Sequence, residues 1–181
     1  MTHDVFICHS SHDRDVADAA CIALERRGLR CWIAPRDFDP GRDYREAIGE
    51  AIAAGRVFLL IFSGAAGSPE LRGETGQAAA LGLPLVLFRT ADAEPGADLA
   101  QLLGSAQRVD ALTPPIAPHL DYLGDTVAQL VDSVRRGPLL PTAAAGPFPG
   151  RGTPNWLPIA LAGAAGLVAI ALAAAYVGSW S

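Results

Sequence analysis

Two uncharged apolar runs, separated by a segment of helix length, constrain the fold more than any other feature. Residues 56–62 carry no charge after Arg56, and residues 83–88 form a second run of the same kind. Continuous apolar runs of this length are typical of strands that are buried on both faces of a sheet. Between them, residues 63–67 break the apolar pattern, and Ser68 followed by Pro69 is a typical helix start. The stretch therefore predicts a strand–helix–strand unit.

Three further strands are predicted at residues 4–8, 29–33 and 107–110. Apolar residues at helical spacing separate them, and the most regular stripe runs from Leu120 to Val134. The first helix is predicted to open on a capping box formed by Ser10 and Asp13, and to end at Gly28. Because strands and helices alternate, we predict an α/β fold: a five-stranded parallel sheet flanked by helices, with flavodoxin-like strand order.

Composition excludes some classes of function. The chain of 181 residues has a formal net charge of −5, and it contains no basic cluster of the kind that binds nucleic acid. Its three cysteines are Cys8, Cys21 and Cys31, an odd number in apolar contexts. Since no pair has the spacing of metal ligands, we interpret them as buried free thiols in a reducing compartment and expect no metal site.

The C-terminal quarter has a different composition. Residues 137–154 are rich in Gly, Pro and Ala and are predicted to be a linker after a folded domain at residues 1–136. Residues 155–178 carry no charge and are long enough to span a bilayer, so we predict a transmembrane helix there. Arginines precede this stretch and none follows it, which predicts a cytoplasmic N-terminal domain. The N-terminus starts directly in a strand, so no signal peptide is expected.

Glu74 is out of place on its predicted helix. It lies three residues after Leu71 and four before Ala78, so it projects from the apolar face that these two residues mark. A carboxylate there is partly desolvated. It could be a structural residue held by a backbone N–H group or by an arginine. Alternatively, it could lie in a cleft at the carboxyl end of the strands, where open α/β sheets bind ligands.

The loop at residues 34–41 is bounded by prolines and combines Arg36, Asp37, Phe38 and Asp39. Loops with a cation, carboxylates and an aromatic residue at strand ends often contact ligands or partners. A solvated connector with no such role explains the composition equally well.

Several of these segments together resemble a Toll/interleukin-receptor (TIR) domain of the bacterial kind. Residues 4–13, Asp-Val-Phe-Ile-Cys-His-Ser-Ser-His-Asp, are similar to the first box of that family, and residues 31–37 with Pro40 and Gly41 are similar to its BB loop. Further similarities, in the family's order, are Ser68, Leu71, Glu74 and Ala78, then residues 84–89, and then residues 110–115 with 118–120. The resemblance covers about residues 1–136.

The resemblance implies an activity. Many bacterial and plant members cleave NAD at the nicotinamide–ribose bond, and the catalytic glutamate of the family matches Glu74. It implies that NAD is a substrate and that no separate cofactor is needed. By the same analogy, the NAD-binding residues would be Ser10, Ser11, Trp32, Pro35, Arg36 and Glu70. Glu70 stands where many members have Trp, so two carboxylates share one helical face in this chain.

The resemblance also implies a setting. A membrane-tethered TIR protein that hydrolyses or cyclises NAD would act in antiviral or stress signalling, and it would become active when copies associate through the BB loop. Its expected partners are other TIR domains, NAD and the membrane, with no nucleic acid. The alternative is a non-catalytic TIR scaffold that acts in signal transduction by binding other TIR domains, with Glu74 as a structural residue.

Overall fold

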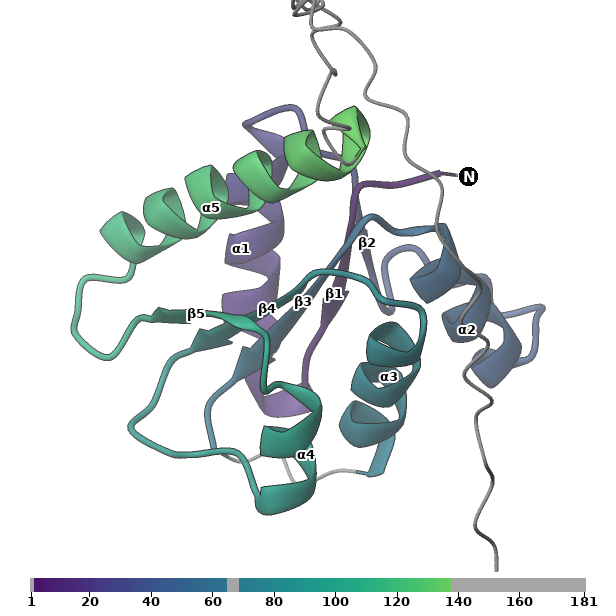
Figure 1. The fold of residues 1–181 in the computed structure, drawn as a ribbon, viewed down its shortest axis with the longest axis horizontal. Coiled ribbons are helices and arrows are strands. Elements are labelled where there is room, and N and C mark those ends of the chain that lie inside the picture. The colour runs from purple at the N-terminus through teal and green to yellow at the C-terminus, as the bar shows by residue number, and fades with distance from the viewer. Residues whose placement is uncertain (1, 65–68, 138–181) are drawn as a thin grey trace, which may run out of the picture. The chain divides into compact units, whose positions relative to one another are not determined.

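The computed structural model describes residues 2–64 and 69–137. Strands and helices alternate along this part of the chain (Figure 1). Their order is β1 (Val5–Cys8), a 3₁₀ turn (Ser11–Asp13), α1 (Arg14–Glu25), β2 (Cys31–Ile33), α2 (Tyr44–Ala54), β3 (Val57–Phe62), α3 (Pro69–Ala80), β4 (Leu85–Arg89), α4 (Ala97–Leu102), β5 (Gln107–Asp110) and α5 (Ala117–Arg136).

The five strands form one parallel sheet in the order β2-β1-β3-β4-β5. In its register, Ile7 of β1 lies between Ile33 of β2 and Leu59 of β3. The predicted strand number, parallel direction and flavodoxin-like order are therefore confirmed. The chain leaves β1 toward β2 on one side and returns to β3 on the other, so the strand order reverses beside β1. Ligands of open α/β sheets bind at such a point.

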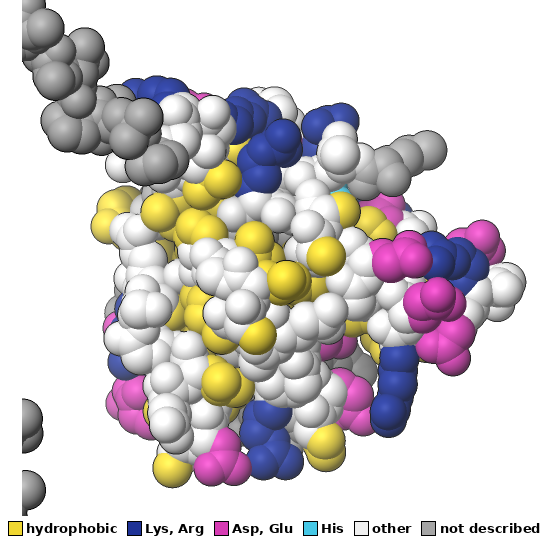
Figure 2. Space-filling view, turned by 45° about the vertical axis from the view of Figure 1, so that its right-hand side comes forward, with side chains coloured by type: hydrophobic (Ala, Val, Ile, Leu, Met, Phe, Trp, Pro, Cys, Tyr) yellow, Lys and Arg dark blue, Asp and Glu magenta, His cyan; other side chains and the backbone are white. Residues whose placement is uncertain are grey.

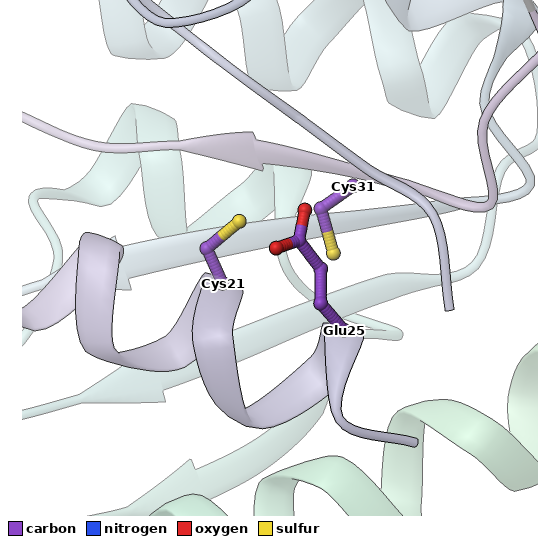
Figure 3. Close-up of side chains that lie close together, drawn as sticks. All are labelled: Cys21, Glu25 and Cys31. Carbon is purple, nitrogen blue, oxygen red and sulfur yellow. The ribbon is translucent and has the colours of Figure 1, made fainter. Parts of the chain in front are cut away.

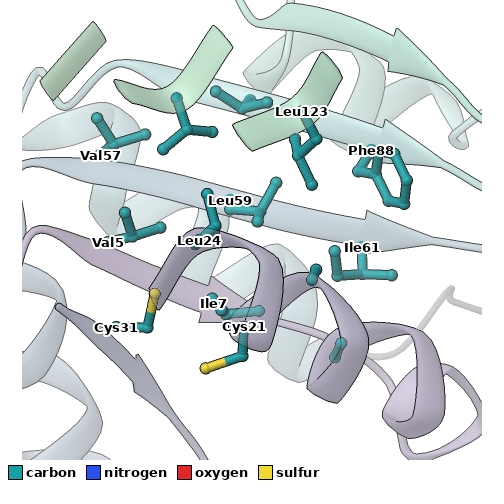
Figure 4. Packing of buried hydrophobic residues seen from close by; sticks show 14 of the residues in the cluster. Val5, Ile7, Cys21, Leu24, Cys31, Val57, Leu59, Ile61, Phe88 and Leu123 are labelled. Carbon is teal, nitrogen blue, oxygen red and sulfur yellow. The ribbon is translucent and has the colours of Figure 1, made fainter. Parts of the chain in front are cut away.

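Helices cover both faces of the sheet: α1 and α5 lie on one face, and α2, α3 and α4 lie on the other (Figure 1). On the first face, Leu24 of α1 and Leu123 of α5 pack on Val5 and Leu59 (Figure 4). Every residue of the central strand β3 is buried, because it is enclosed by helices above and below and by strands on both sides. This explains why the strand reads as an uninterrupted apolar run.

The edge strand β5 is different, because only Val109 of its four residues is buried. Arg108 and Asp110 flank that residue and are exposed. Asp110 accepts hydrogen bonds from Arg89 of β4 at 2.9 and 3.1 Å and from Arg108 at 3.1 Å. The outer rim of the sheet at β5 is therefore charged on both sides of one apolar residue.

The start of α1 differs from the prediction. The Ser10 hydroxyl donates a hydrogen bond to the Asp13 carboxylate at 2.7 Å, and it caps no backbone N–H group. Asp13 is buried and accepts that hydrogen bond, and the helix begins only at Arg14, after the 3₁₀ turn. The capping box is therefore wrong. The helix ends at Glu25, earlier than the predicted end at Gly28, and Gly28 closes the turn that follows with a φ of 77°, which favours glycine.

The buried carboxylate of Asp4 lies at the amino ends of the strands and connects several elements there. The Asp4 side chain is 1% exposed and accepts hydrogen bonds from the Arg30 N–H group at 3.1 Å, Arg56 at 2.6 Å and Arg135 at 2.9 Å. Basic side chains gather along the upper rim of the face in Figure 2. Burial raises the pKa of Asp4, but these hydrogen bonds and the arginine charges outweigh it, so the pKa lies below its ordinary value. Asp4 thus joins β1 to β2, β3 and α5.

The predicted transmembrane helix at residues 155–178 and nearly all of the predicted linker at 137–154 lie outside the described residues. Across the described part of the chain, none of the helices combines the length and the apolarity that crossing a bilayer requires.

Candidate functional site

A cavity of about 280 Å³ opens at the carboxyl ends of β1 and β2, where α2 and α3 meet them. It lies beside the reversal of strand order, the position that the fold favours for a ligand. Its wall combines an apolar floor with a few polar groups, as small-molecule sites commonly do. The lining residues are Phe6, Ile7, Cys8, His9, Ser11, Arg14, Trp32, Ala34, Pro35, Tyr44, Ile48 and Glu74.

Glu74 is the one carboxylate among these lining residues. It is partly buried, and it receives a hydrogen bond from the Cys8 thiol. Within residues 2–64 and 69–137, no arginine forms an ion pair with it. Burial raises the pKa of Glu74, and the charge of Glu70 adds to the effect, while the Cys8 hydrogen bond and the neighbouring His9 lower it. The carboxylate therefore lines the cavity at a free-energy cost of desolvation that none of the arginines in the described part of the chain offsets.

Cys8 holds that carboxylate from the end of β1. Its side chain is 2% exposed, and burial together with the Glu74 charge raises the pKa of its thiol well above the ordinary value. Cys8 consequently stays protonated at neutral pH and remains a donor to Glu74. The prediction of a buried free thiol is confirmed for Cys8.

Aromatic side chains build the floor of the cavity. Trp32 stacks on Phe6 with ring centroids 5.0 Å apart, and Phe6 stacks on Phe58 at 5.5 Å. At the mouth, Tyr44 is 47% exposed and forms an edge-to-face pair with Phe38, with ring centroids 5.2 Å apart. Each adjacent pair of rings is parallel to within 9°, and this stacking fixes the orientation of Trp32. A planar ligand ring could lie against Trp32 or Tyr44.

The structure brings together most of the residues that the sequence singles out. Glu74, Ser11, Trp32 and Pro35 line the cavity. Ser10 lies beside Ser11 but turns its hydroxyl to Asp13. Glu70 lines a neighbouring hollow of about 540 Å³, which shares Tyr44, Ile48 and Glu74 with the first. The two carboxylates of α3 therefore face adjoining hollows.

Arg36 is not among the residues that line either hollow. Its guanidinium donates to Glu25 at 2.8 Å, to Asp37 at 2.8 Å and to the Cys31 carbonyl at 3.0 Å. Asp37 also accepts a hydrogen bond from the Ile33 N–H group at 2.9 Å, so it fixes the turn after β2. These ion pairs hold Arg36 on the α1 side of β2.

Sequence reasoning missed several lining residues. Arg14 of α1 and Tyr44 of α2 both line the cavity, and neither was singled out from the sequence. The His9 ring nitrogens lie 2.8 Å from the Ser10 carbonyl oxygen and 3.1 Å from that of Ala34, so this side chain connects the ends of β1 and β2. The signal that could have identified His9 is its place directly after a buried strand.

Comparisons with known proteins agree with this fold. A protein-family model described as "TIR domain" matches residues 5–115. The solved TIR domain of the Toll-related receptor TRR-2 from Hydra magnipapillata is 21% identical, with a TM-score of 0.59, and the match covers 70% of this chain and 99% of that one. The heterodimer of the RPS4 and RRS1 TIR domains is 12% identical, with a TM-score of 0.55 and coverage of 74% and 100%.

A third similar structure is the CMP N-glycosidase BcmB from Clostridium botulinum, at 18% identity, a TM-score of 0.50 and coverage of 66% and 97%. At these identities the solved structures support the fold alone. The search of curated proteins found no match to this chain.

Proposed function

This chain belongs to the TIR domain family, and from that premise we propose that it cleaves NAD at the nicotinamide–ribose bond, with Glu74 as the catalytic carboxylate. The observation that carries the proposal is the position of Glu74. Its carboxylate lines a cavity at the carboxyl ends of the strands, and among the described residues no arginine neutralises it. A purely structural glutamate at this depth would be expected to have such a partner.

The reaction needs few protein groups. The bond between the ribose carbon and the pyridinium nitrogen breaks, its electron pair stays on nitrogen, and nicotinamide leaves as a neutral molecule. No general acid is therefore required. Positive charge develops on the ribose as it gains oxocarbenium character, and a fixed carboxylate beside it lowers the energy of that state. Water or a second nucleophile of the substrate then attacks the ribose carbon, which gives hydrolysis or cyclisation.

The other lining residues suggest how NAD would be held. Trp32 and Tyr44 offer aromatic surfaces to a base. Arg14 lies at the cavity with its side chain 57% exposed, and it is better placed than Arg36 to meet a phosphate. Ser11 adds a hydroxyl group to the same wall.

Two of the similar structures are compatible with this proposal. BcmB is described as a CMP N-glycosidase, so the fold is compatible with cleavage of a nucleotide's N-glycosidic bond. The RPS4–RRS1 structure is described as a TIR domain heterodimer, which supports other TIR domains as partners in signal transduction. We further propose that residues 155–178 anchor the protein in a membrane, where two-dimensional confinement would raise the effective concentration of copies.

The proposal is tested by incubating the full-length chain, in detergent micelles and over a range of protein concentrations, with NAD. We expect nicotinamide release whose specific rate rises with protein concentration, since association should activate the chain. A chain that binds other TIR domains but releases no nicotinamide at any concentration would instead be the non-catalytic scaffold.

The charge of Glu70 gives a separate prediction. Because that charge raises the pKa of Glu74, Glu70→Gln should lower the pKa of Glu74 and retain cleavage at neutral pH. The pH below which kcat/KM falls should move downward, because the catalytic carboxylate stays ionised in more acidic solution. The measurement is the pH profile of kcat/KM. Loss of activity at pH 7 in this variant would mean that Glu70, and not Glu74, is the catalytic carboxylate.

The hydrogen bond from Cys8 gives a prediction of the opposite sign. Cys8→Ala removes a donor that lowers the pKa of Glu74, so the fall in kcat/KM should begin at a higher pH than in the unmodified protein. Cys8→Ser keeps a donor at the same place and is the matched control, with a profile close to that of the unmodified protein. Identical profiles for the Ala and Ser variants would contradict a positioning role for Cys8.

A further inference from the structure

Three potential metal ligands converge on the side of β2 that faces away from the NAD cavity. Cys21 and Glu25 lie one helical turn apart on α1, and Cys31 is the first residue of β2. The two sulfur atoms and a Glu25 carboxylate oxygen all lie within 4.8 Å of one another. Figure 3 shows the Glu25 carboxylate between the two sulfur atoms.

The fold brings these residues together although ten positions separate the cysteines. Residues i and i+4 of a helix share a face, which aligns Cys21 with Glu25. Alternate residues of a strand point to opposite faces, so Cys31 faces α1 while Trp32 faces the NAD cavity. Both thiols are free, and the two residues are 2% and 9% exposed. Glu25 is exposed and leaves a path to solvent.

We propose that Cys21, Glu25 and Cys31 form a binding site for a divalent cation of borderline softness, with Zn²⁺ as the best fit. Two thiolates and a carboxylate would occupy three of the four positions in the tetrahedral coordination of Zn²⁺, and a water molecule would occupy the fourth. Hard cations such as Mg²⁺ and Ca²⁺ prefer oxygen donors only, so this ligand set selects against them.

A positive charge already faces these donors. One terminal nitrogen of Arg36 lies 3.3 Å from the Cys21 sulfur and 2.8 Å from the Glu25 carboxylate. Thiolate is the form of cysteine that binds metal, and this guanidinium lies within reach of the Cys21 sulfur. The other terminal nitrogen of Arg36 is held by Asp37 and the Cys31 carbonyl. Zn²⁺ would therefore compete with one nitrogen of the guanidinium without detaching the whole side chain.

The first test adds Co²⁺, and in parallel Zn²⁺, to the full-length chain kept reduced with a phosphine. We expect one Co²⁺ per chain, with a sulfur-to-cobalt charge-transfer band and visible bands typical of four-coordinate cobalt, both lost on addition of Zn²⁺. Variants Cys21→Ser and Cys31→Ser should bind Co²⁺ at least about tenfold more weakly and without the full charge-transfer band, and Glu25→Gln about tenfold more weakly.

Two matched variants serve as controls, and a third tests the competition with Arg36. Asp18→Asn changes another exposed carboxylate of α1, whose side chain is 56% exposed, and Cys8→Ser removes the third thiol; both should bind Co²⁺ as the unmodified protein does. Arg36→Gln removes the competing charge and should bind Co²⁺ more tightly. Unchanged or weaker binding in Arg36→Gln would contradict the competition.

A measurement on the unmodified chain avoids dependence on variants that fail to fold. Zn²⁺ should slow the alkylation of Cys21 and Cys31 relative to the metal-free chain, as followed by peptide mass spectrometry. The proposal is overturned if Co²⁺ binds without a charge-transfer band, or if Zn²⁺ protects neither cysteine. It is also overturned if Cys21 and Cys31 bind no metal in the reduced protein and their one reaction is to form a disulfide in air. None of these readouts depends on NAD cleavage, so failure of one proposal leaves the other intact.

Discussion

Glu74→Gln is expected to reduce nicotinamide release by at least about 100-fold and, at the same time, to raise the melting temperature by a few degrees. The loss of activity follows because the amide cannot offset the positive charge that develops on the ribose, and removal of one electrostatic stabiliser commonly costs about 10²–10³ in rate. The gain in stability follows because the amide has no charge to desolvate in the cavity. The two measurements are a nicotinamide-release assay and thermal unfolding followed by circular dichroism.

The pH dependence of that stability difference has a defined sign. Burial raises the pKa of Glu74 above its ordinary value of 4.5, so the folded state binds a proton more readily than the unfolded state. Stability from this group is therefore greatest below pH 4.5 and falls as the pH rises through the raised pKa of the folded state. Glu74→Gln should thus exceed the unmodified protein in melting temperature at pH 7, with a difference that shrinks on acidification.

The matched control is Glu46→Gln, which changes an exposed carboxylate on α2 outside both hollows. It should keep nicotinamide release and change the melting temperature little. A Glu74→Gln protein that cleaves NAD normally would remove Glu74 from the reaction. A Glu74→Gln protein that is inactive but less stable would indicate a structural carboxylate instead.

Asp4→Asn is expected to lower the free energy of unfolding by about 3 kcal/mol, because it leaves arginine charges packed around a site with no anion. The Asp4 side chain is 1% exposed, whereas those of Arg56 and Arg135 are 34% and 45% exposed. Because solvent reaches the two arginines, the loss of stability should lie at the lower end of the range for breaking a buried ion pair. Chemical denaturation of the full-length chain at pH 7 measures it.

The pH dependence for Asp4 is opposite to that for Glu74. The pKa of Asp4 is lowered in the folded state, so its contribution to stability is complete above the ordinary value of 3.8 and is lost as the pH falls through the lowered pKa. The difference between Asp4→Asn and the unmodified protein should therefore close in acid. Asp132→Asn, an exposed partner of Arg135 at 3.8 Å, is the control and should cost less than about 1 kcal/mol. An Asp4→Asn protein as stable as this control would contradict the prediction.

Much of the fold was predictable because the three inner strands of the sheet, β1, β3 and β4, are buried along their whole length. The apolar runs of β3 and β4 have no exposed face, so they read as strands without any knowledge of their neighbours. Parallel direction followed from the alternation of strands with helices. The position of Glu74 on an apolar helical face also led to the candidate cavity, because residues three and four positions away along a helix share its face.

Other features depend on contacts between distant residues, which no local pattern records. Arg36 follows Pro35, which lines the cavity, yet ion pairs with Glu25 and Asp37 hold it on the other side of β2. Cys21 and Cys31 lack the spacing of metal ligands, and only the return of the chain from α1 into β2 brings them together. The capping box failed because Asp13 is buried and attracts the Ser10 hydroxyl.

The charged rim at β5 limits how copies of this chain can join. An unprotected edge strand invites a second molecule to extend the sheet through backbone hydrogen bonds. In β5 only Val109 is buried among exposed residues, and desolvating Arg108 and Asp110 would oppose a continuous intermolecular sheet. At the opposite edge, β2 offers only three residues for such pairing. Assemblies of this chain should consequently grow through helix and loop surfaces, which keeps them reversible and distinct from amyloid-like stacking.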